Sequence, residues 1–397
     1  MTDSAEQTRQ PVAVDPATIL VVDDVAALRL LIGGILKAAG FHTIIFAADG
    51  VEAIAIIEAT PVDMIVIDIM MPRMDGFEVC RQVRGRLGLN VPILIQSGLE
   101  DADERATAFD AGASDIVSKP IHAHEIVSRV RLHLERRRMI DRLQLYQRRM
   151  EEELRAAEAM QMSLLKSPEA VAEIAEPRGA SLTTFYQASN QLGGDLWQVF
   201  EIDASRFGLY MVDLSGHGVA AAINAFRLHL LAETLDQHRS APGRWLAALN
   251  DHLYQMLPVE HFATAFYAVV DIANGRVDYA AAGSPPPIVL EADGGWRPLD
   301  GGGLLLGCVA GIQYETYQTA IAPGDRILLY SDALYENFDD ADQSLEQSDL
   351  AELARSVLQS VSGAGFHQAL VERVFEDEAA QRRDDLTLML LEVPADG

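Results

Sequence analysis

Hydrophobic and polar residues alternate with two different periods along the first third of the chain. Short apolar runs suited to buried strands are separated by stretches with the spacing of amphipathic helices. The predicted strands are Thr18–Val22, His42–Ala47, Met64–Ile67, Pro92–Gln96 and Asp115–Ser118. The helix-like stretches begin near Val25, Gly50, Gly76 and Asp103. Strands that alternate with helices in this way predict an α/β domain with a doubly wound, parallel, five-stranded sheet.

The pattern then becomes helical from about His122 to Lys166, a segment without proline or glycine. Within it, positions recur at alternating spacings of three and four: Ile140, Leu143, Gln147, Met150, Leu154, Ala157, Gln161 and Leu164. This is the seam of a two-stranded coiled coil, so we expect a long helical linker that forms a homodimer. A lone helix packed on its neighbours is the alternative, because the two glutamines weaken the seam.

From about Ala180 onward, strand-like runs are interrupted by helical blocks, which predicts an α+β architecture. The strands are Ser181–Gln187, Phe207–Leu214, Thr264–Ile272, Arg276–Ala282, Arg326–Tyr330 and Leu386–Glu392. The helical blocks are Val219–Gln237, Gly243–Met256, Leu345–Ser360 and Gly365–Ala379. We therefore expect a flexible leader at 1–16, a first domain at 17–136, a linker at 137–166 and a second domain at 167–397.

Composition limits the expected partners. The net charge of −28 at pH 7 argues against nucleic acid, because phosphate backbones bind clustered lysine and arginine. Basic residues do gather between Arg129 and Arg149, but interleaved acids and apolar positions favour a solvated helix face over a binding patch. Apolar runs fall short of the roughly 18 residues of a membrane span. A polar leader and two distant cysteines, Cys80 and Cys308, predict a cytoplasmic protein.

Chemically distinctive side chains stand where the predicted parallel strands end. Asp23 and Asp24 follow the first strand, Asp68 follows the third, Ser97 the fourth and Lys119 the fifth. In a doubly wound sheet these ends meet at one edge. Three carboxylates there would repel one another unless a divalent cation held them. A carboxylate beside Mg²⁺ and lysine can accept a phosphoryl group, because both cations offset the transferred charge.

This combination closely resembles the response-regulator receiver domain, over roughly residues 17–136. The resemblance implies that Asp68 is the phosphoacceptor and that a sensor histidine kinase is its phosphoryl donor. It also implies Mg²⁺ bound by Asp23, Asp24, Asp68 and the backbone of Met70, with Ser97 as the switch hydroxyl and Lys119 as the lysine of the site. The loop from Met71 to Gly76 matches as well. One position departs from the family: Ile116 stands where an aromatic residue often occurs.

Four aspartates dominate the C-terminal half, each beside glycine, serine or a second acid at the end of an apolar run. They are Asp195, Asp213, Asp332 and Asp384. Strand ends that converge can gather such carboxylates into one oxygen-lined pocket, which Mg²⁺ and Mn²⁺ prefer. Water activated there by two divalent ions can attack a phosphate ester. The sequence thus predicts a metal-dependent phosphatase.

These segments look like the PPM-type protein phosphatases of the SpoIIE-like branch, from about Glu158 to Val393. The resemblance implies a β-sandwich flanked by helices that binds two Mn²⁺ or Mg²⁺. Asp195, Asp213, Asp332, Asp384 and the carbonyl of Leu214 would hold the ions. His217 is either a general acid or a turn residue that donates to the backbone. Three positions depart from the family pattern, namely Gln198, Ser284 and Ala333.

Together the two resemblances predict a two-component regulator in which phosphorylation of Asp68 controls a serine/threonine phosphatase. By family resemblance the substrate is a phosphorylated anti-sigma-factor antagonist. The direction of the control is not encoded in these motifs. The alternative is a catalytically weak or dead phosphatase-like adaptor that binds a sigma-factor regulator under receiver control.

Overall fold

A computed structural model gives the structure of the chain. It describes residues 15–98, 102–216, 218–258, 260–336, 346–361, 365–375 and 384–395. By their internal contacts the residues divide into two compact units, Met1–Arg149 and Met150–Gly397. The division lies inside the linker expected at 137–166, and the expected domain boundaries stay predictions.

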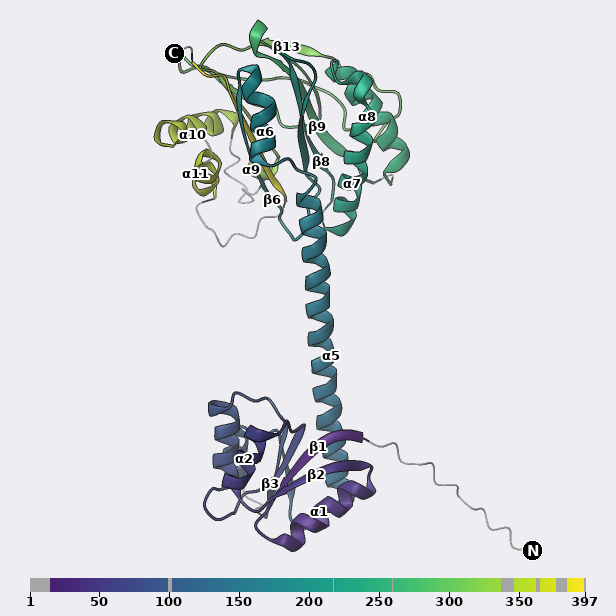
Figure 1. Ribbon diagram of the computed structural model, residues 1–397, viewed down its shortest axis with the longest axis vertical. Coiled ribbons are helices and arrows are strands. Elements are labelled where there is room, and N and C mark those ends of the chain that lie inside the picture. The colour runs from purple at the N-terminus through teal and green to yellow at the C-terminus, as the bar shows by residue number, and fades with distance from the viewer. Residues whose placement is uncertain are drawn as a thin grey trace, which may run out of the picture. The chain divides into compact units, whose positions relative to one another are not determined.

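The first unit contains a five-stranded parallel sheet with the strand order β2-β1-β3-β4-β5 (Figure 1). Its strands are β1 (Asp15–Val22), β2 (Phe41–Ala47), β3 (Met64–Asp68), β4 (Ile93–Ser97) and β5 (Asp115–Ser118). Each predicted strand is present, with starts that differ by three residues at most. The doubly wound parallel sheet expected from the sequence is therefore confirmed.

Helices cover both faces of this sheet. The helices are α1 (Ala26–Ala38), α2 (Gly50–Ala59), α3 (Gly76–Arg81), α4 (Ala102–Asp110) and the first part of α5 (Ala123–Met162). One apolar core joins α1 and α5 to the sheet through residues such as Ile32 and Val130. The other core joins α2, α3 and α4 to the opposite face through residues such as Ile54 and Ala108. A single π-helical turn, Gln82–Arg86, follows α3.

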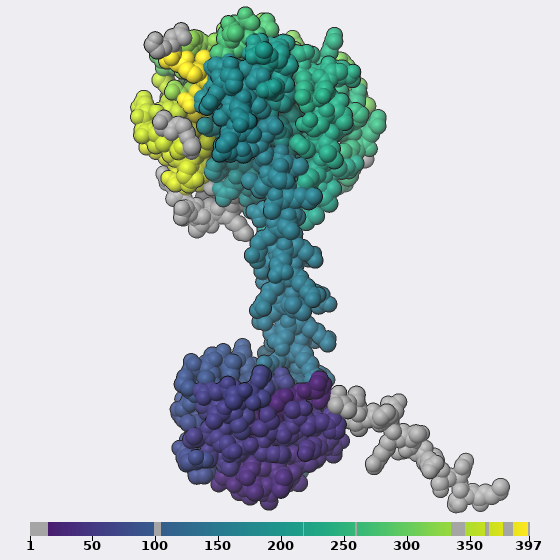
Figure 2. Space-filling view, in the orientation of Figure 1, coloured from purple at the N-terminus to yellow at the C-terminus, as the bar shows by residue number. Residues whose placement is uncertain are grey.

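Helix α5 runs without interruption from Ala123 to Met162. Three positions of the predicted seam, Ile140, Leu143 and Met150, leave 45%, 62% and 59% of their surface exposed in the single chain. The middle of α5 shows its side chains openly on the face seen in Figure 2. Gln161, in contrast, is buried inside the second unit. Gln161, near the end of the predicted seam, therefore packs within its own chain and not against a second helix.

The second unit is built from two antiparallel five-stranded sheets. The first sheet, in the order β13-β10-β9-β8-β7, consists of Tyr317–Ala320, Arg276–Ala282, Ala263–Asp271, Phe207–Leu214 and Leu196–Glu201. The second, in the order β12-β11-β14-β15-β6, consists of Trp296–Pro298, Ile288–Leu290, Arg326–Tyr330, Leu386–Glu392 and Ser181–Gln187. All six predicted strands are present within one residue of their expected bounds.

The two sheets pack face to face (Figure 1). Helices cover their outer faces, except for α6 (Pro168–Ala175), which joins the core between the sheets through Val171 and Ala175. The other helices are α7 (Val219–Glu233), α8 (Pro242–Met256), α9 (Ala333–Glu336), α10 (Gln347–Ser360) and α11 (Gly365–Val374). Residues of β6–β11, β14 and β15 form the core between the sheets. Helices α7 and α8 cover the first sheet, and α10 and α11 cover the second. The expected β-sandwich flanked by helices is confirmed.

Four strands escaped the sequence analysis. Three of them, β11, β12 and β13, have only three or four residues, too few for a periodic pattern. The fourth, β7, carries a buried glutamine in its middle, Gln198, which interrupts its apolar run. The side chain of Gln198 donates a hydrogen bond to the carbonyl of Leu164. In the described part of the chain, no helix is both long and apolar enough to cross a membrane.

His367 on α11 provides a pH-dependent contribution to the stability of the second unit. Its ring is buried, and Nε2 lies 2.9 Å from the hydroxyl oxygen of Thr183 on β6. Burial lowers the pKa of His367 to about 4. The unfolded chain therefore takes up this proton at a higher pH than the folded chain does. The stabilisation is complete above the unfolded pKa of about 6.5 and is lost as the pH falls through the folded pKa.

We expect His367→Gln to reduce the pH dependence of unfolding of the second unit. Between pH 7.5 and 5.0 the wild type should lose about 2 kcal/mol more unfolding free energy than the variant. Tryptophan fluorescence during urea unfolding reports on this unit alone, because Trp197, Trp245 and Trp296 all lie in it. The exposed His252→Gln is the control and should behave like the wild type. Equal pH dependence in all three proteins would contradict the assignment.

Candidate functional site

Three acids converge at the carboxyl edge of the parallel sheet. Val22 at the end of β1 pairs with Ile67 of β3, which brings Asp23 beside Asp68. Asp24 follows directly on the same loop. One ligand atom from each of Asp23, Asp24 and Asp68 lies within 4.8 Å of the other two. The structure therefore brings together the three carboxylates that the sequence analysis assigned to Mg²⁺.

Lys119 supplies the positive charge of this site. Its Nζ lies 2.7 Å from Oδ2 of Asp68 and 3.7 Å from Oδ2 of Asp23. The other oxygen of Asp68, Oδ1, accepts a hydrogen bond of 2.8 Å from the amide of Ile69. These contacts fix the orientation of the Asp68 carboxylate and set a cation beside the oxygen that would accept a phosphoryl group.

The donor set of this site fits a hard divalent cation. Asp23 is fully buried, and burial raises the pKa of its carboxyl group. Oδ1 of Asp23 accepts a hydrogen bond from the amide of Val25, whereas its buried Oδ2 has no hydrogen-bond partner among the described residues. A second carboxylate, Asp24, is open to solvent beside it. Mg²⁺ prefers oxygen ligands, and a bound Mg²⁺ would give the buried Oδ2 of Asp23 the partner that it lacks.

The remaining predicted residues of this unit lie at the same edge or beneath it. Ser97 ends β4, and its carbonyl accepts a hydrogen bond of 2.7 Å from the amide of Lys119. Met70 lies two residues after Asp68, with an exposed side chain. Ile116 on β5 is buried in the core that packs against α2, α3 and α4. The position that is often aromatic in receivers is thus filled here by a packed aliphatic side chain.

The loop after Asp68 is held close to Asp68 by its last residue, Gly76. The amide of Gly76 donates to the carbonyl of Ile69 at 2.9 Å. A Cβ atom at Gly76 would lie 2.4 Å from the carbonyl oxygen of Asp68, so only glycine fits this approach. Asp75 caps α3 by accepting a hydrogen bond of 2.7 Å from the amide of Glu78.

The second cluster of acids forms where both sheets of the sandwich end. Leu196 of β7 pairs with Val212 of β8, which sets Asp195 next to Asp213. In the other sheet Tyr330 of β14 pairs with Leu388 of β15. Asp332 lies two residues after the last residue of β14, and Asp384 lies two residues before the first residue of β15, so both lie at the end of the sheet where Tyr330 pairs with Leu388. The tertiary structure thus gathers four aspartates that are up to 189 positions apart in the sequence.

Asp213 interacts electrostatically with each of the other three carboxylates. Asp195 is 2% exposed, and burial, followed by repulsion from Asp213, raises its pKa well above the usual value. Burial, followed by repulsion from Asp332 and then Asp384, raises the pKa of Asp213 to about 7. Without a cation such a cluster is unfavourable, because like charges approach one another away from water.

The second cluster offers the ligand type that divalent ions need. Several carboxylates together are what a pair of Mg²⁺ or Mn²⁺ ions would require. The buried Oδ1 of Asp195 has no hydrogen-bond partner among the described residues, so it remains a candidate ligand atom.

Hydroxyl groups that the sequence analysis did not single out position these acids. The hydroxyl of Thr387 donates to Oδ2 of Asp195 at 2.5 Å and so joins the two sheets. The hydroxyl of Ser331 donates to the carbonyl of Asp385 at 3.0 Å and accepts from the amide of Thr387 at 2.9 Å. The sequence could have indicated these two hydroxyl groups, because Ser331 and Thr387 belong to the same short motifs as Asp332 and Asp384.

Asp385 fixes the loop that carries Asp195. Its Oδ1 accepts from the amide of Ser189 at 2.8 Å, and its Oδ2 accepts from the amide of Gly194 at 2.5 Å. A Cβ at Gly193 would lie 2.3 Å from Asp385 Oδ2, and one at Gly194 would lie 2.6 Å from the carbonyl oxygen of Leu214. The two glycines are thus required for close approach. The carbonyl of Leu214, predicted as a metal ligand, faces this loop.

The end of α5 binds directly to the same loop. The side-chain amide of Gln161 donates from Nε2 to the carbonyl of Gly193 at 2.7 Å and accepts at Oε1 from the amide of Gly193 at 3.2 Å. Gln161 is 5% exposed. Gln198, three residues after Asp195, holds the carbonyl of Leu164 just beyond α5. The family departure at Gln198 therefore has a structural role.

The other predicted positions have less defined roles. Ala333 is buried at the start of α9, directly after Asp332. The buried hydroxyl oxygen of Ser284 has no hydrogen-bond partner among the described residues. His217 lies outside the described residues. His261 is close to the loop after β8, with Nδ1 3.2 Å from the carbonyl oxygen of Ser215.

Two known families match separate parts of the chain. The response regulator receiver domain matches residues 19–131, and Stage II sporulation protein E (SpoIIE) matches residues 203–394. The response regulator MprA of Mycobacterium ulcerans is 42% identical over 123 residues, which are 31% of this chain and 52% of MprA. The phosphoserine phosphatase RsbP of Bacillus subtilis is 27% identical over 221 residues, which are 53% of this chain and 52% of RsbP.

The chain spans about half the length of the curated relatives it matches. Among solved structures, the SiaA-PP2C domain of Pseudomonas aeruginosa superimposes with a TM-score of 0.54 at 17% identity. That similarity covers 62% of this chain and 98% of the SiaA domain, and it shows a shared fold. The chain joins a response regulator receiver domain to a SpoIIE-type PPM phosphatase domain.

Proposed function

We propose that this protein is a response regulator whose output is the metal-dependent dephosphorylation of phosphoserine or phosphothreonine on a protein. The proposal depends on one observation: Asp195, Asp213, Asp332 and Asp384 converge at one end of the sandwich and influence one another. A sensor histidine kinase would supply the phosphoryl group to Asp68.

In the receiver domain, Asp68 is the nucleophile toward the phosphoryl donor. Lys119, 2.7 Å from Oδ2 of Asp68, offsets negative charge on the transferred group. Asp23, Asp24, Asp68 and the backbone of Met70 would hold Mg²⁺, and bound Mg²⁺ adds positive charge next to the transferred group. The hydroxyl of Ser97 would donate a hydrogen bond to the phosphorylated Asp68.

In the phosphatase domain, the four aspartates and the carbonyl of Leu214 would hold two Mn²⁺ or Mg²⁺. When bound, such ions lower the pKa of water and offset the charge that develops on the phosphate. Thr387 and Asp385 would hold Asp195 and its glycine loop in place through the hydrogen bonds described above. A general-acid role for His217 belongs to the same proposal.

The proposed substrate is a phosphorylated anti-sigma-factor antagonist. Similarity to a SpoIIE-type domain and to a phosphoserine phosphatase supports this choice of substrate class. The cytoplasmic location and the homodimer through α5 belong to the same proposal. The exposed Ile140, Leu143 and Met150 support the dimer, because they follow the heptad spacing along α5.

Control would pass from Asp68 to the phosphatase site through α5. The same helix packs on the receiver sheet through Ile126 and Val130 and contacts Gly193 through Gln161. A shift of α5 would therefore act on the peptide two residues before Asp195. Because α5 has no proline or glycine, it can transmit such a shift as a stiff rod.

A second candidate is a phosphatase-like adaptor that binds a sigma-factor regulator without turnover. The departures from the family pattern at Gln198, Ser284 and Ala333 favour this reading. The presence of all four aspartates favours the enzyme.

Acetyl phosphate with Mg²⁺ should label the wild-type protein and leave Asp68→Asn unlabelled. The amide keeps the shape of the side chain but lacks the nucleophilic oxygen. Intact-protein mass spectrometry measures the added phosphoryl group. Asp75→Asn, on the loop after the site, is the matched control and should be labelled like the wild type. Equal labelling of Asp68→Asn would reject this residue as the acceptor.

Asp213→Asn should weaken metal uptake and strongly reduce turnover in the phosphatase domain. We expect hydrolysis of p-nitrophenyl phosphate with Mn²⁺ to fall roughly a hundredfold or more, because one of the carboxylates that would hold the ions is lost. Calorimetry should show weaker Mn²⁺ uptake, with the receiver site still filled. The exposed Asp236→Asn is the control. Normal metal uptake without turnover in the wild type would instead support the adaptor.

Gln161→Ala should weaken the link between the two domains. In the wild type, beryllofluoride bound at Asp68 should change the phosphatase rate on a phosphoserine protein. In Gln161→Ala this change should be smaller, because the peptide of Gly193 loses both of its side-chain hydrogen bonds. Gln147→Ala, on the exposed part of α5, is the matched control. Equal rates with and without beryllofluoride in the wild type would contradict coupling.

A further inference from the structure

A pocket of about 340 Å³ lies in the first unit, away from both acid clusters. Pro92 and Ser114, which line it, directly precede β4 and β5. The pocket therefore lies at the amino edge of the parallel sheet, whereas Asp68 lies at the carboxyl edge. Its polar lining includes Arg84, Asn90, Ser114, Arg136, Arg137 and Gln144.

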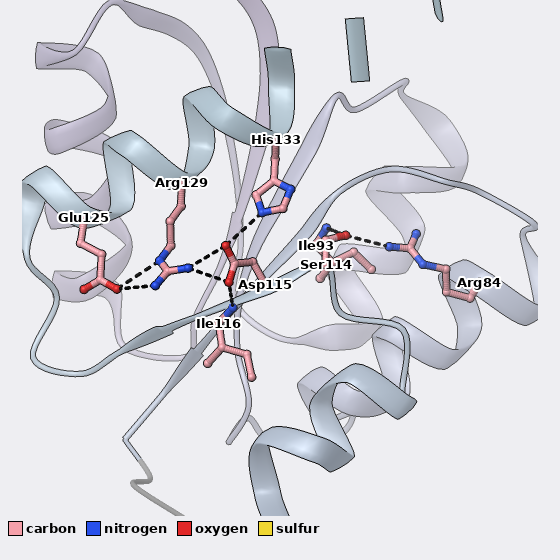
Figure 3. Close-up of polar contacts among 8 residues, drawn as sticks. All are labelled: Arg84, Ile93, Ser114, Asp115, Ile116, Glu125, Arg129 and His133. Carbon is pink, nitrogen blue, oxygen red and sulfur yellow. Dashed lines mark hydrogen bonds and ion pairs between the residues drawn. The ribbon is translucent and has the colours of Figure 1, made fainter. Parts of the chain in front are cut away.

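One wall of the pocket is a face of α5. His133, Arg137, Ile140 and Gln144 follow one another at spacings of three and four, so they share this face. They belong to the basic stretch from Arg129 to Arg149. Figure 3 shows that His133 turns toward Asp115 on β5, with Nε2 3.0 Å from Oδ2. The helix face is thus fixed to the sheet beside the pocket.

The opposite wall contains a guanidinium without a countercharge. Arg84, from the π-helical turn, donates to the carbonyls of Gly112, Leu89 and Val91 at 3.0, 2.7 and 2.8 Å. It also donates to the hydroxyl of Ser114 at 3.3 Å (Figure 3). Burial lowers the pKa of Arg84. Among the described residues no acid forms an ion pair with Arg84, so three backbone carbonyls and one hydroxyl hold its guanidinium group in place.

Positive charge predominates around the pocket. Arg136 has no ion pair within the described chain, and Arg137 contacts Asp141 only at 3.8 Å. Asp141 is the single acid of the lining, against three arginines. Arg129 is paired instead with Asp115, at 2.7 Å, and with Glu125, at 3.0 Å. A local excess of arginine is unexpected in a chain with a net charge of −28.

We propose that this pocket binds a nucleoside mono- or diphosphate. Arginine guanidinium groups match phosphate oxygens in geometry and charge. Pro92 provides an apolar wall for an organic group, and the amides of Asn90 and Gln144 provide donors and acceptors for a base. The volume suits a small organic ligand better than a bare phosphate.

A solvated helix face explains the exposed arginines of α5 but does not explain Arg84. Arg84 is not on α5. Its guanidinium group is held at the pocket by hydrogen bonds to the carbonyls of Gly112 and Val91, which lie in two separate loops. A ligand held between Arg84 and Arg136 would connect α5 to the loops before β4 and β5. Nucleotide binding would thus be a second input to the helix that contacts Gly193, independent of Asp68.

Calorimetric titration of the full-length protein tests the proposal. The probes are ADP and GDP, with inorganic phosphate and adenosine as comparisons. EDTA is present throughout, so that both acid clusters lack cations and repel anions. We expect ADP or GDP to bind more tightly than inorganic phosphate, and adenosine not to bind.

Variants locate the binding. Arg136→Glu should weaken nucleotide binding about tenfold or more, because one attractive charge becomes repulsive. Arg142→Glu is the matched control, since Arg142 is exposed on the same helix outside the pocket. Hydrogen–deuterium exchange should show protection by the nucleotide at 84–92 and 133–144. This second measurement does not depend on the folding of any variant.

Three results would overturn the proposal. One is the absence of binding by both nucleotides at millimolar concentration. Another is inorganic phosphate binding as tightly as ADP and GDP, which would reveal an adventitious anion site only. The third is equal weakening by Arg136→Glu and Arg142→Glu without protection at 84–92, which would reveal general attraction to a basic helix.

Discussion

Repulsion between carboxylates gathered at strand ends is the constraint on which the rest of this structure depends. In the sandwich, burial and mutual repulsion raise the pKa of Asp195 and Asp213 far above the value of a free carboxyl group. In the receiver, Lys119 offsets part of the charge of Asp68, yet Asp23 keeps a buried oxygen without a hydrogen bond. A folded chain maintains such clusters only if the surrounding packing fixes them.

The packing does so with backbone groups and hydroxyls. Amides orient Asp23 and Asp68, while Thr387 and Asp385 orient Asp195 and its loop. Glycines stand where backbone and carboxylate come too close for any side chain. These supports leave specific carboxylate oxygens unused, and divalent cations would bind to them. The two units therefore build similar chemistry on unrelated folds, parallel strands in one and a sandwich in the other.

Helix α5 belongs to both units and takes part in both sites indirectly. Near its start it is fixed to β5 through Arg129 and His133, and near its end it is fixed to the loop before Asp195 through Gln161. Its middle exposes apolar seam positions. Phosphorylation at Asp68, dimerisation, and ligand binding beside Arg84 would all act on this one element. Such a helix can combine several signals, because it is the shared physical path between them.

Periodicity and short motifs are local properties, so the two fold classes, most strand bounds and the acids at the strand ends could be predicted from the sequence. It missed the short strands β11–β13, whose length allows no period, and β7, whose buried Gln198 breaks the apolar run. It also placed Gln161 on a coiled-coil seam, whereas the tertiary structure buries this side chain against Gly193. The side chains that support Asp195, and the arginines that line the pocket beside Arg84, became apparent only from the folded chain. Those contacts join residues far apart in the chain, and no local pattern records them.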